Sequence, residues 1–532
     1  MSHLWNACQQ APRKFLIAIG LVSVVLSGCD EESKVGYAPA SSEAREEMML
    51  MNSTDQEDYQ HYQENPFLEV SAEALSTFSS SVDTASYTNC RSKLNTGTLP
   101  PKDAVRIADF VNYFQYQYEG PKDNKPVRFH LEVAKCPWQS KHLLLRIGVQ
   151  AKKIDPAELP ARNLVFLIDT SGSMSEHNKL PLVINSLELL VNQLTAKDRV
   201  AIVTYAGNAG VVLPPTSGAE KDRIGQALQR LKAGGSTNGE GGIREAYSLA
   251  QQNYSPTSLN RVILATDGDF NVGITDRSQL VRLLEEKRKT GIYLTCLGYG
   301  MGNLKDTTLE QMSHHGNGFY AYIDNINEAK KVFVDQGGAL VTVAKDVKLQ
   351  VEFNPAHIAG YRLIGYENRL LRAEDFRNDA KDAGDMGSGH TCTALYELVP
   401  AGLTVPASKS PELKYQDKPK LSKSGLTNEM LTMRMRYKDP VSDAAQEIET
   451  SVKANQIEAA PSADFHCAAA AAGFGMLLRK SEFAGTADYD SVIAWATKSI
   501  VYDPGQHRSE LIQLATIAKG LASKEEKLPP GK

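Results

Sequence analysis

Short apolar runs alternate with amphipathic segments through the middle of the chain. Runs that predict buried strands lie at 163–168, 199–205, 261–266 and 292–297, and each is followed by apolar residues at helical spacing. Strands that alternate with helices favour a mostly parallel sheet with helices on both faces. The pattern therefore predicts a doubly wound, Rossmann-like α/β domain over residues 161–340.

The sequence on both sides of this domain alternates between apolar and polar residues, as half-buried strands do. Residues 129–151 predict a hairpin, and further strands are expected at 347–353, 361–366, 391–399 and 431–437. We predict that the two flanks pair into one β-sandwich and that the α/β domain is inserted into it. Such insertions are tolerated because the two ends of a domain often lie close together.

Helical spacing returns near both ends of the folded part. Residues 67–118 are expected to be mainly helical, with Asp83 as the N-cap of a helix over 84–94. Asp464 is the expected N-cap of a helix over 465–480. Further helices of the tail are expected at 488–500 and 508–521.

The first residues predict a targeting signal that is not part of the fold. Arg13 and Lys14 precede an apolar run at 15–26, which is too short to span a bilayer as a helix. The run ends in the letters LSGC, which resemble the bacterial lipobox, where the signal is cut and the cysteine is lipidated. We expect a signal peptide over 1–28 and a membrane anchor at Cys29. An ordinary secretory signal, with Cys29 incidental, is the alternative.

An acidic stretch follows the predicted lipid anchor. Residues 30–66 contain ten acidic and two basic residues and few apolar ones, so we expect a flexible tether over 29–66. Asp30 resembles the inner-membrane retention signal of enterobacterial lipoproteins. The expected location is therefore the periplasmic side of a bacterial cell envelope, at the inner membrane if that sorting rule applies.

Five cysteines remain for the folded part, and they are widely spaced without a C-x-x-C pair. An extracytoplasmic location permits disulfides, but the pairing does not follow from the sequence. Because the number is odd, at least one thiol is expected to be free, most simply Cys296 in a buried strand. The five are Cys90, Cys136, Cys296, Cys392 and Cys467.

Several classes of function are disfavoured. A net charge of −5 over 532 residues argues against a nucleic-acid-binding protein. Gly298, Gly300 and Gly302 lack the spacing of a dinucleotide fingerprint, so no nucleotide is expected. The usual hydrolase motifs are absent, and we interpret His314 and His315 as a surface pair. We expect no enzyme, although residues dispersed in sequence can still form a triad in three dimensions.

Oxygen-bearing side chains follow the predicted strands of the α/β domain. Asp169, Ser171 and Ser173 come after the first strand, Asp267 comes after the third, and Thr237 lies in a glycine-rich loop. The carboxyl ends of parallel strands meet at one edge of a sheet, where ligands bind. Carboxylates and hydroxyls are hard ligands that suit Mg²⁺, Mn²⁺ or Ca²⁺. The sequence therefore predicts a metal site at this edge.

These five positions resemble the metal-ion-dependent adhesion site (MIDAS) of the von Willebrand factor A (vWA) domain. The resemblance implies that Ser171 and Ser173 bind the cation directly and that Thr237 does so directly or through water. Asp169 and Asp267 would then hold ligating waters and supply negative charge. Mg²⁺ is the cation we expect most, with Mn²⁺ and Ca²⁺ as alternatives. In the family, an exchangeable position accepts an Asp or Glu carboxylate from a partner protein.

Nearly the whole mature chain is similar to bacterial YfbK-type vWA lipoproteins. The resemblance implies a vWA-associated region over 67–160, a vWA domain over 161–340 and a C-terminal domain over 341–525. Ser81 departs from the acidic residue that the family pattern has there, which leaves any capping or metal role of that position open. The segments that carry the resemblance are 64–87, 99–118, 266–273 and 389–400.

The sequence thus predicts a lipid-anchored binding protein of the cell envelope. Its expected partner is a protein with an exposed Asp or Glu, bound through a divalent cation. A structural scaffold with a merely stabilising metal is one alternative, and an uncharacterised hydrolase is another.

Overall fold

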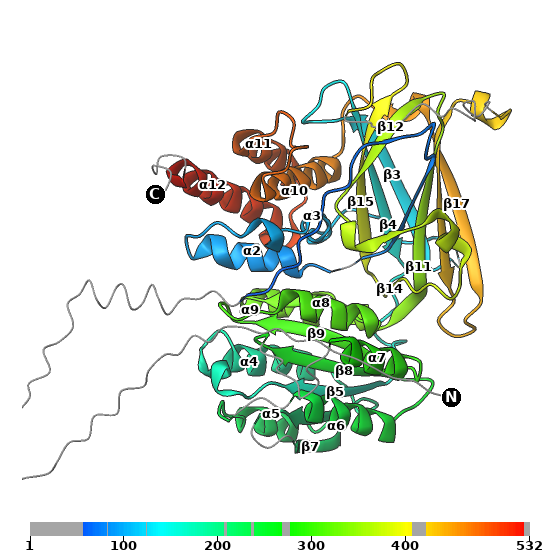
Figure 1. The fold of residues 1–532 in the computed structure, drawn as a ribbon. Coiled ribbons are helices and arrows are strands. Elements are labelled where there is room, and N and C mark those ends of the chain that lie inside the picture. The colour runs from blue at the N-terminus through cyan, green and yellow to red at the C-terminus, as the bar shows by residue number, and fades with distance from the viewer. Residues whose placement is uncertain are drawn as a thin grey trace, which may run out of the picture. The chain divides into compact units, whose positions relative to one another are not determined.

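In the computed structural model, the described part of the chain contains three sheets and the helices that pack around them (Figure 1). No helix in this part is long and apolar enough to cross a bilayer. The signal peptide over 1–28 and the lipid anchor at Cys29 lie outside it and stay predictions. The described residues are 57–81, 83–123, 125–206, 210–235, 239–268, 277–406 and 422–525.

The α/β domain has the predicted doubly wound arrangement. Its sheet has the order β10-β9-β8-β5-β6-β7, in which β7 is antiparallel to β6 and the other pairs are parallel. Two apolar cores cover its faces, one with α4, α5 and α9 and the other with α6, α7 and α8. The strands are β5 (Arg162–Ile168), β6 (Arg199–Thr204), β7 (Gly210–Ser217), β8 (Leu259–Thr266), β9 (Tyr293–Tyr299) and β10 (Tyr320–Ile323). The helices are α4 (Leu180–Asn192), α5 (Lys221–Gln229), α6 (Gly239–Gln252), α7 (Arg277–Arg288), α8 (Asp306–His315) and α9 (Ile326–Lys330), the last followed by a π-helical turn at Lys331–Asp335.

The central strand β5 explains why the sequence run was continuously apolar. All of its residues are buried, and successive side chains point to opposite faces of the sheet. Leu164 and Phe166 join the core beneath α4, whereas Val165 and Leu167 join the core beneath α6. A strand that is covered on both faces is therefore apolar over most of its length, here from Leu164 to Ile168.

The predicted β-sandwich is confirmed, and each of its two sheets contains strands from both sides of the α/β domain. In the first sheet, β4 (Leu143–Ala151) pairs with β15 (Thr391–Pro400). In the second, β2 (Leu75–Ser79) pairs with β11 (Thr342–Phe353). The two sheets face each other across one apolar core. The hairpin and β11 therefore lie in opposite sheets of one sandwich, and the α/β domain is inserted between β4 and β11.

The sandwich has strands that the sequence pattern did not predict. Residues 67–118 are not mainly helical, because β1 and β2 lie within them and belong to the sandwich. β17 was also missed. The remaining strands are β1 (Leu68–Glu69), β3 (Val127–Lys135), β12 (Ile358–Ile364), β13 (Leu370–Leu371), β14 (Gly384–Gly387), β16 (Glu429–Lys438), β17 (Ala445–Lys453) and β18 (Ile457–Glu458).

Helices from both ends of the described chain share one apolar core. Tyr87 and Phe110 of the N-terminal helices lie in the same cluster as Phe474 and Leu514 of the tail. The alanines of α10 are buried there, and their small side chains let neighbouring helices approach closely. These helices are α2 (Ala85–Asn95), α3 (Ile107–Asn112), α10 (Ala463–Arg479), α11 (Tyr489–Ser499) and α12 (His507–Glu525).

The two aspartates predicted as N-caps have other roles. Asp83 does not cap α2; its carboxylate accepts a hydrogen bond from the Tyr320 amide at 2.8 Å and pairs with Arg369 at 2.7 Å. Asp464 lies inside the first turn of α10 and pairs with Arg508 at 2.6 Å, while another residue, a serine, caps the helix. In both cases a buried guanidinium binds the carboxylate, because an unpaired buried charge costs far more than an unmade cap.

Residues 57–66 form the end of the stretch predicted as a flexible tether, and that prediction is wrong for them. Asp58 donates its amide proton to the Leu304 carbonyl at 3.0 Å. The Asn65 side chain is buried and donates to the carbonyl of Gly365 at 2.8 Å. This segment is therefore bound to the folded part. The five described cysteines are all buried with free thiols, as expected for Cys296.

Buried ion pairs connect the α/β domain to the rest of the protein. Arg91 of α2 pairs with Asp324 at 2.6 Å, and Arg106 pairs with Asp306. Each arginine lies outside the α/β domain and each of these acids lies inside it. Arg369 of the sandwich makes a third connection, because it pairs with Glu310 of α8 at 2.9 Å as well as with Asp83.

We expect Arg369→Met to destabilise the protein by about 3 kcal/mol or more, because it leaves two buried carboxylates, Asp83 and Glu310, without their counter-charge. Urea unfolding measures the change. Arg372→Met is the matched control, since Arg372 lies on the surface beside the exposed Glu374 and is expected to have little effect. Equal effects of the two substitutions would contradict a structural role of the buried pairs.

Candidate metal site at the sheet edge

The predicted site lies where two neighbouring parallel strands end. Asp169 follows β5, and its amide still donates to the Ala265 carbonyl of β8 at 2.9 Å. Asp267 follows the last residue of β8. Both aspartates have 0% exposure. The strand register therefore brings the two carboxylates to the same edge, as the sequence predicted.

The turn after β5 presents the two predicted hydroxyls. The Ser171 amide donates to Asp169 Oδ1 at 2.8 Å, which closes an Asx turn. This turn brings the hydroxyl oxygens of Ser171 and Ser173 to 3.0 Å from each other. Two hydroxyls and the carboxylate that orders their turn thus share one short segment.

The glycine-rich loop is fixed to the same turn. The Gly234 amide donates to the Thr170 carbonyl at 2.8 Å, and the Gly172 amide donates to the Gly235 carbonyl at 3.3 Å. Thr237 follows this loop but lies outside the described residues, so its part in the site stays a prediction. Four of the five predicted residues are described.

Asp169 is held by three donors that surround it. While Oδ1 accepts from Ser171, Oδ2 accepts from Thr266 Oγ1 at 3.0 Å and from the Tyr205 hydroxyl at 3.2 Å. Burial nevertheless raises the pKa of Asp169 to about 6, and the nearby Asp267 adds to the increase. A nearby cation would stabilise the ionised form of such a carboxylate.

The positively charged side chain of Lys179 lies at this edge, and the sequence pattern did not predict it. Lys179 Nζ lies 3.0 Å from Asp267 Oδ2 and 3.2 Å from Asn303 Oδ1. In the sequence, Lys179 is a single charge before the apolar helix α4, and nothing in its spacing connects it to the site. Thr266 and Tyr205 were also missed, although their positions at the ends of β8 and β6 place them at this edge.

The residues present fit a hard divalent cation. Two carboxylates and two hydroxyls meet at one edge, and oxygen donors of this kind are the ligands that Mg²⁺ prefers. Within the described residues, no group of three or more His, Cys, Asp or Glu could hold a metal ion. In a metal site at this edge, the hydroxyls of Ser171 and Ser173 would add to the two carboxylates.

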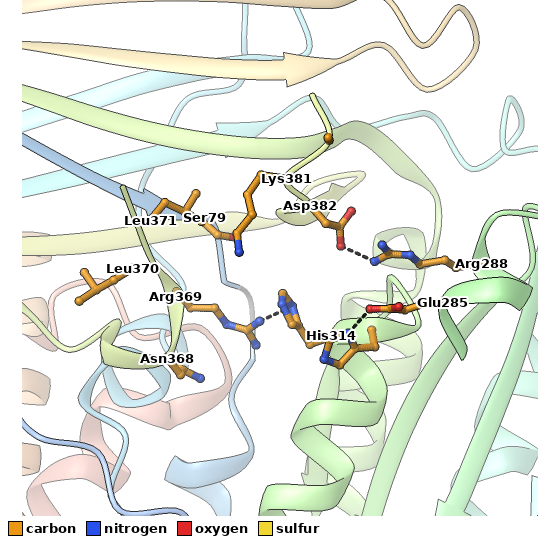
Figure 2. A pocket seen from close by; sticks show the side chains of 12 residues that line it. Ser79, Glu285, Arg288, His314, Asn368, Arg369, Leu370, Leu371, Lys381 and Asp382 are labelled. Carbon is orange, nitrogen blue, oxygen red and sulfur yellow. Dashed lines mark hydrogen bonds and ion pairs between the residues drawn. The ribbon is translucent and has the colours of Figure 1, made fainter. Parts of the chain in front are cut away.

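A cavity of about 330 Å³ at the junction of α7 and α8 with the sandwich is a second candidate site (Figure 2). Its charged residues contact one another: Arg288 pairs with Asp382, and Arg369 contacts His314. His314 is partly buried and not fully exposed as predicted, and desolvation beside Arg369 holds its pKa well below the usual range. The Ser79 hydroxyl, which also lines the cavity, bonds to backbone atoms and not to His314. The cavity therefore lacks the serine–histidine contact that a hydrolase would need.

We expect Thr266→Val to destabilise the protein by about 1–3 kcal/mol in metal-free buffer, because the Thr266 hydroxyl both donates to Asp169 and accepts from the Gly268 amide at 3.1 Å. Thr204→Val is the matched control: Thr204 is also buried at the end of a neighbouring strand, and its hydroxyl makes no hydrogen bond to a described residue. Urea unfolding of both variants measures the difference. Equal midpoints would show that the Thr266 hydroxyl does not support the site.

The chain matches three family profiles. Residues 163–335 match "von Willebrand factor type A domain", residues 53–146 match "von Willebrand factor", and residues 338–521 match "Uncharacterized protein YfbK, C-terminal". The first match covers the inserted α/β domain and its sheet edge. The third covers the last strands of the sandwich and most of the helical tail.

Individual proteins and a solved structure are also similar to this chain. The "Uncharacterized protein YfbK" of Escherichia coli (strain K12) is 42% identical over 472 residues, which are 87% of this chain and 81% of that protein. The human inter-alpha-trypsin inhibitor heavy chain H2 is 26% identical over 208 residues, 37% of this chain and 21% of that protein. A solved von Willebrand factor type A structure from Catenulispora acidiphila is 15% identical, covers 76% of this chain and 91% of that one, and has a TM-score of 0.41. On the extent and identity of the first match, the chain belongs to the YfbK family and contains a vWA domain.

Proposed function

We propose that this protein is a cell-envelope lipoprotein that binds a partner protein through a divalent cation held at the edge of its vWA domain. The observation that carries the proposal is the meeting of Asp169, Ser171, Ser173 and Asp267 at the ends of β5 and β8. A vWA domain itself suggests interaction with another protein. The metal, the acidic partner and the lipid anchor are the finer parts of the proposal.

The proposal assigns a role to each residue of the site. Ser171 and Ser173 would hold Mg²⁺ through their hydroxyls, and Thr237 would complete the set. Asp169 and Asp267 would hold waters and supply charge, while Thr266 and Tyr205 keep Asp169 oriented. When bound, Mg²⁺ supplies a Lewis-acidic centre that an Asp or Glu of the partner coordinates. Hydroxyl ligands carry no charge, which favours attraction of an incoming carboxylate.

The lipid anchor at Cys29 would keep this site at the membrane surface. The acidic residues between Cys29 and residue 57 separate the anchor from the bound segment 57–66. This arrangement supports a partner that lies in or near the same membrane. Asp30 favours the inner membrane under the enterobacterial sorting rule.

We expect Mg²⁺ to raise the melting temperature of the protein in a dose-dependent manner, with a chelator reversing the shift. A ligand at 100 times its dissociation constant stabilises the folded state by about 2.7 kcal/mol. Asp169→Ala is expected to abolish the shift. The matched control Asp222→Ala removes an exposed carboxylate from α5 of the same domain and is expected to keep it.

A crosslinking experiment distinguishes a protein that binds its partner through the metal from a structural scaffold. Crosslinking in envelope membranes, with Mg²⁺ or with chelator, is expected to give a metal-dependent partner for the wild type and for Asp222→Ala, and none for Asp169→Ala. The absence of any metal-dependent shift in the melting temperature would refute the mechanism. A shift with unchanged capture in Asp169→Ala would favour a scaffold whose metal only stabilises the fold.

A further inference from the structure

A lysine side chain is built into the proposed metal site. Lys179 Nζ contacts Asp267 Oδ2 at 3.0 Å, and the Asn303 side-chain oxygen accepts a second hydrogen bond from it at 3.2 Å. The Lys179 side chain is 5% exposed and that of Asp267 is 0% exposed. The two charges are therefore paired away from bulk water, where their interaction is little screened.

The stem of Lys179 is held as firmly as its ammonium group. Gly300 lies against this stem, and a Cβ at that position would lie 2.4 Å from Lys179 Cε and 2.6 Å from Cγ. The φ angle of Gly300 is +69°, which also favours glycine. The Lys179 carbonyl accepts from the Val183 amide at 2.9 Å at the start of α4. The backbone, the stem and the ammonium group are thus all fixed at the sheet edge.

We propose that Lys179 is a built-in cation of the metal site, which weakens the binding of the divalent cation and adds a positive charge to the loaded site that attracts an acidic partner. This inference rests on the proposed function, because it concerns the charge of the same site. It adds Lys179 to the four described residues of the site, and it assigns this residue to partner binding and not to metal ligation.

The charge count explains both effects. Asp169 and Asp267 together carry two negative charges when ionised, so a divalent cation alone would leave the site neutral. The ammonium group of Lys179 reduces the empty site to one negative charge, and the affinity of oxygen sites for divalent cations depends on the charge of the ligand set. With the metal bound, the charges of Lys179, Asp169, Asp267 and the divalent cation sum to one positive charge. Opposite charges attract strongly in a partly buried site, so an incoming carboxylate is favoured.

The test uses Lys179→Met and Lys179→Gln, which remove the charge, and Lys179→Arg, which keeps it. Free Mn²⁺ is measured by electron paramagnetic resonance during titration of the full mature chain. We expect both neutral variants to bind Mn²⁺ about tenfold more tightly than the wild type and Lys179→Arg to bind it about equally. Circular dichroism in the presence of Mn²⁺ verifies that each variant is folded.

The partner side of the proposal is tested with acetate as the carboxylate probe. Acetate is titrated into the Mn²⁺-loaded proteins, and the water relaxation of the bound Mn²⁺ reports its entry. The neutral variants are expected to bind acetate about tenfold more weakly than the wild type, which is opposite to their effect on the metal. A lysine with a purely structural role would affect both measurements in the same direction: its replacement would weaken Mn²⁺ binding and acetate binding, or neither.

The outcomes separate this inference from the proposed function. If the wild type binds Mn²⁺ and the neutral variants bind it equally or more weakly, the inference is overturned while the metal site stands. If the wild type binds no Mn²⁺ but the neutral variants do, the opposing role of Lys179 is supported and the metal dependence of the native protein is refuted. If none of them binds Mn²⁺, both proposals fall.

Discussion

The buried carboxylates at the ends of two adjacent strands are the constraint on which this sheet edge depends. Asp169 and Asp267 have no exposure, and a buried carboxylate is costly unless donors or cations compensate it. The chain supplies that compensation from several elements: a backbone amide in the turn, a hydroxyl from β8, a phenol that follows β6, and the ammonium group of Lys179. The two buried acids thus bring residues from four separate segments together at one edge.

The same rule governs the attachment of the inserted domain. Ion pairs join the helical and sandwich parts to acids of the α/β domain through Arg91, Arg106 and Arg369, and each pair is buried. Such pairs contribute less net stability than an apolar contact of equal size, but they are intolerant of misplacement because a broken pair leaves a buried charge. In this structure the three arginines pair with acids of the α/β domain at the same time. The sandwich reinforces this attachment, because strands on both sides of the insertion pair within each sheet.

The sequence predicted what local periodicity determines and missed what distant contacts determine. The apolar run of β5 and the alternation in β16 are visible because burial acts on every residue or on every second residue. β2 reads LSTFS, and its small polar residues gave no such signal. Asp83 was predicted as a cap because the local pattern allows it, whereas its partner Arg369 is 286 positions away. Lys179 was missed for the same reason. Its contacts are with Asp267 and Asn303, which are distant in the sequence and close only in the folded structure.

The described end of the stretch predicted as a tether is attached to the loop that contacts Lys179. The Gly302 amide donates to Glu57 Oε1 at 2.8 Å, and Asp58 bonds to the Leu304 carbonyl. Asn303, between these two positions, accepts from Lys179, which in turn contacts Asp267. Glu57 and Asp58 therefore lie beside the loop that orients Lys179, and this part of the described chain is fixed next to the candidate site.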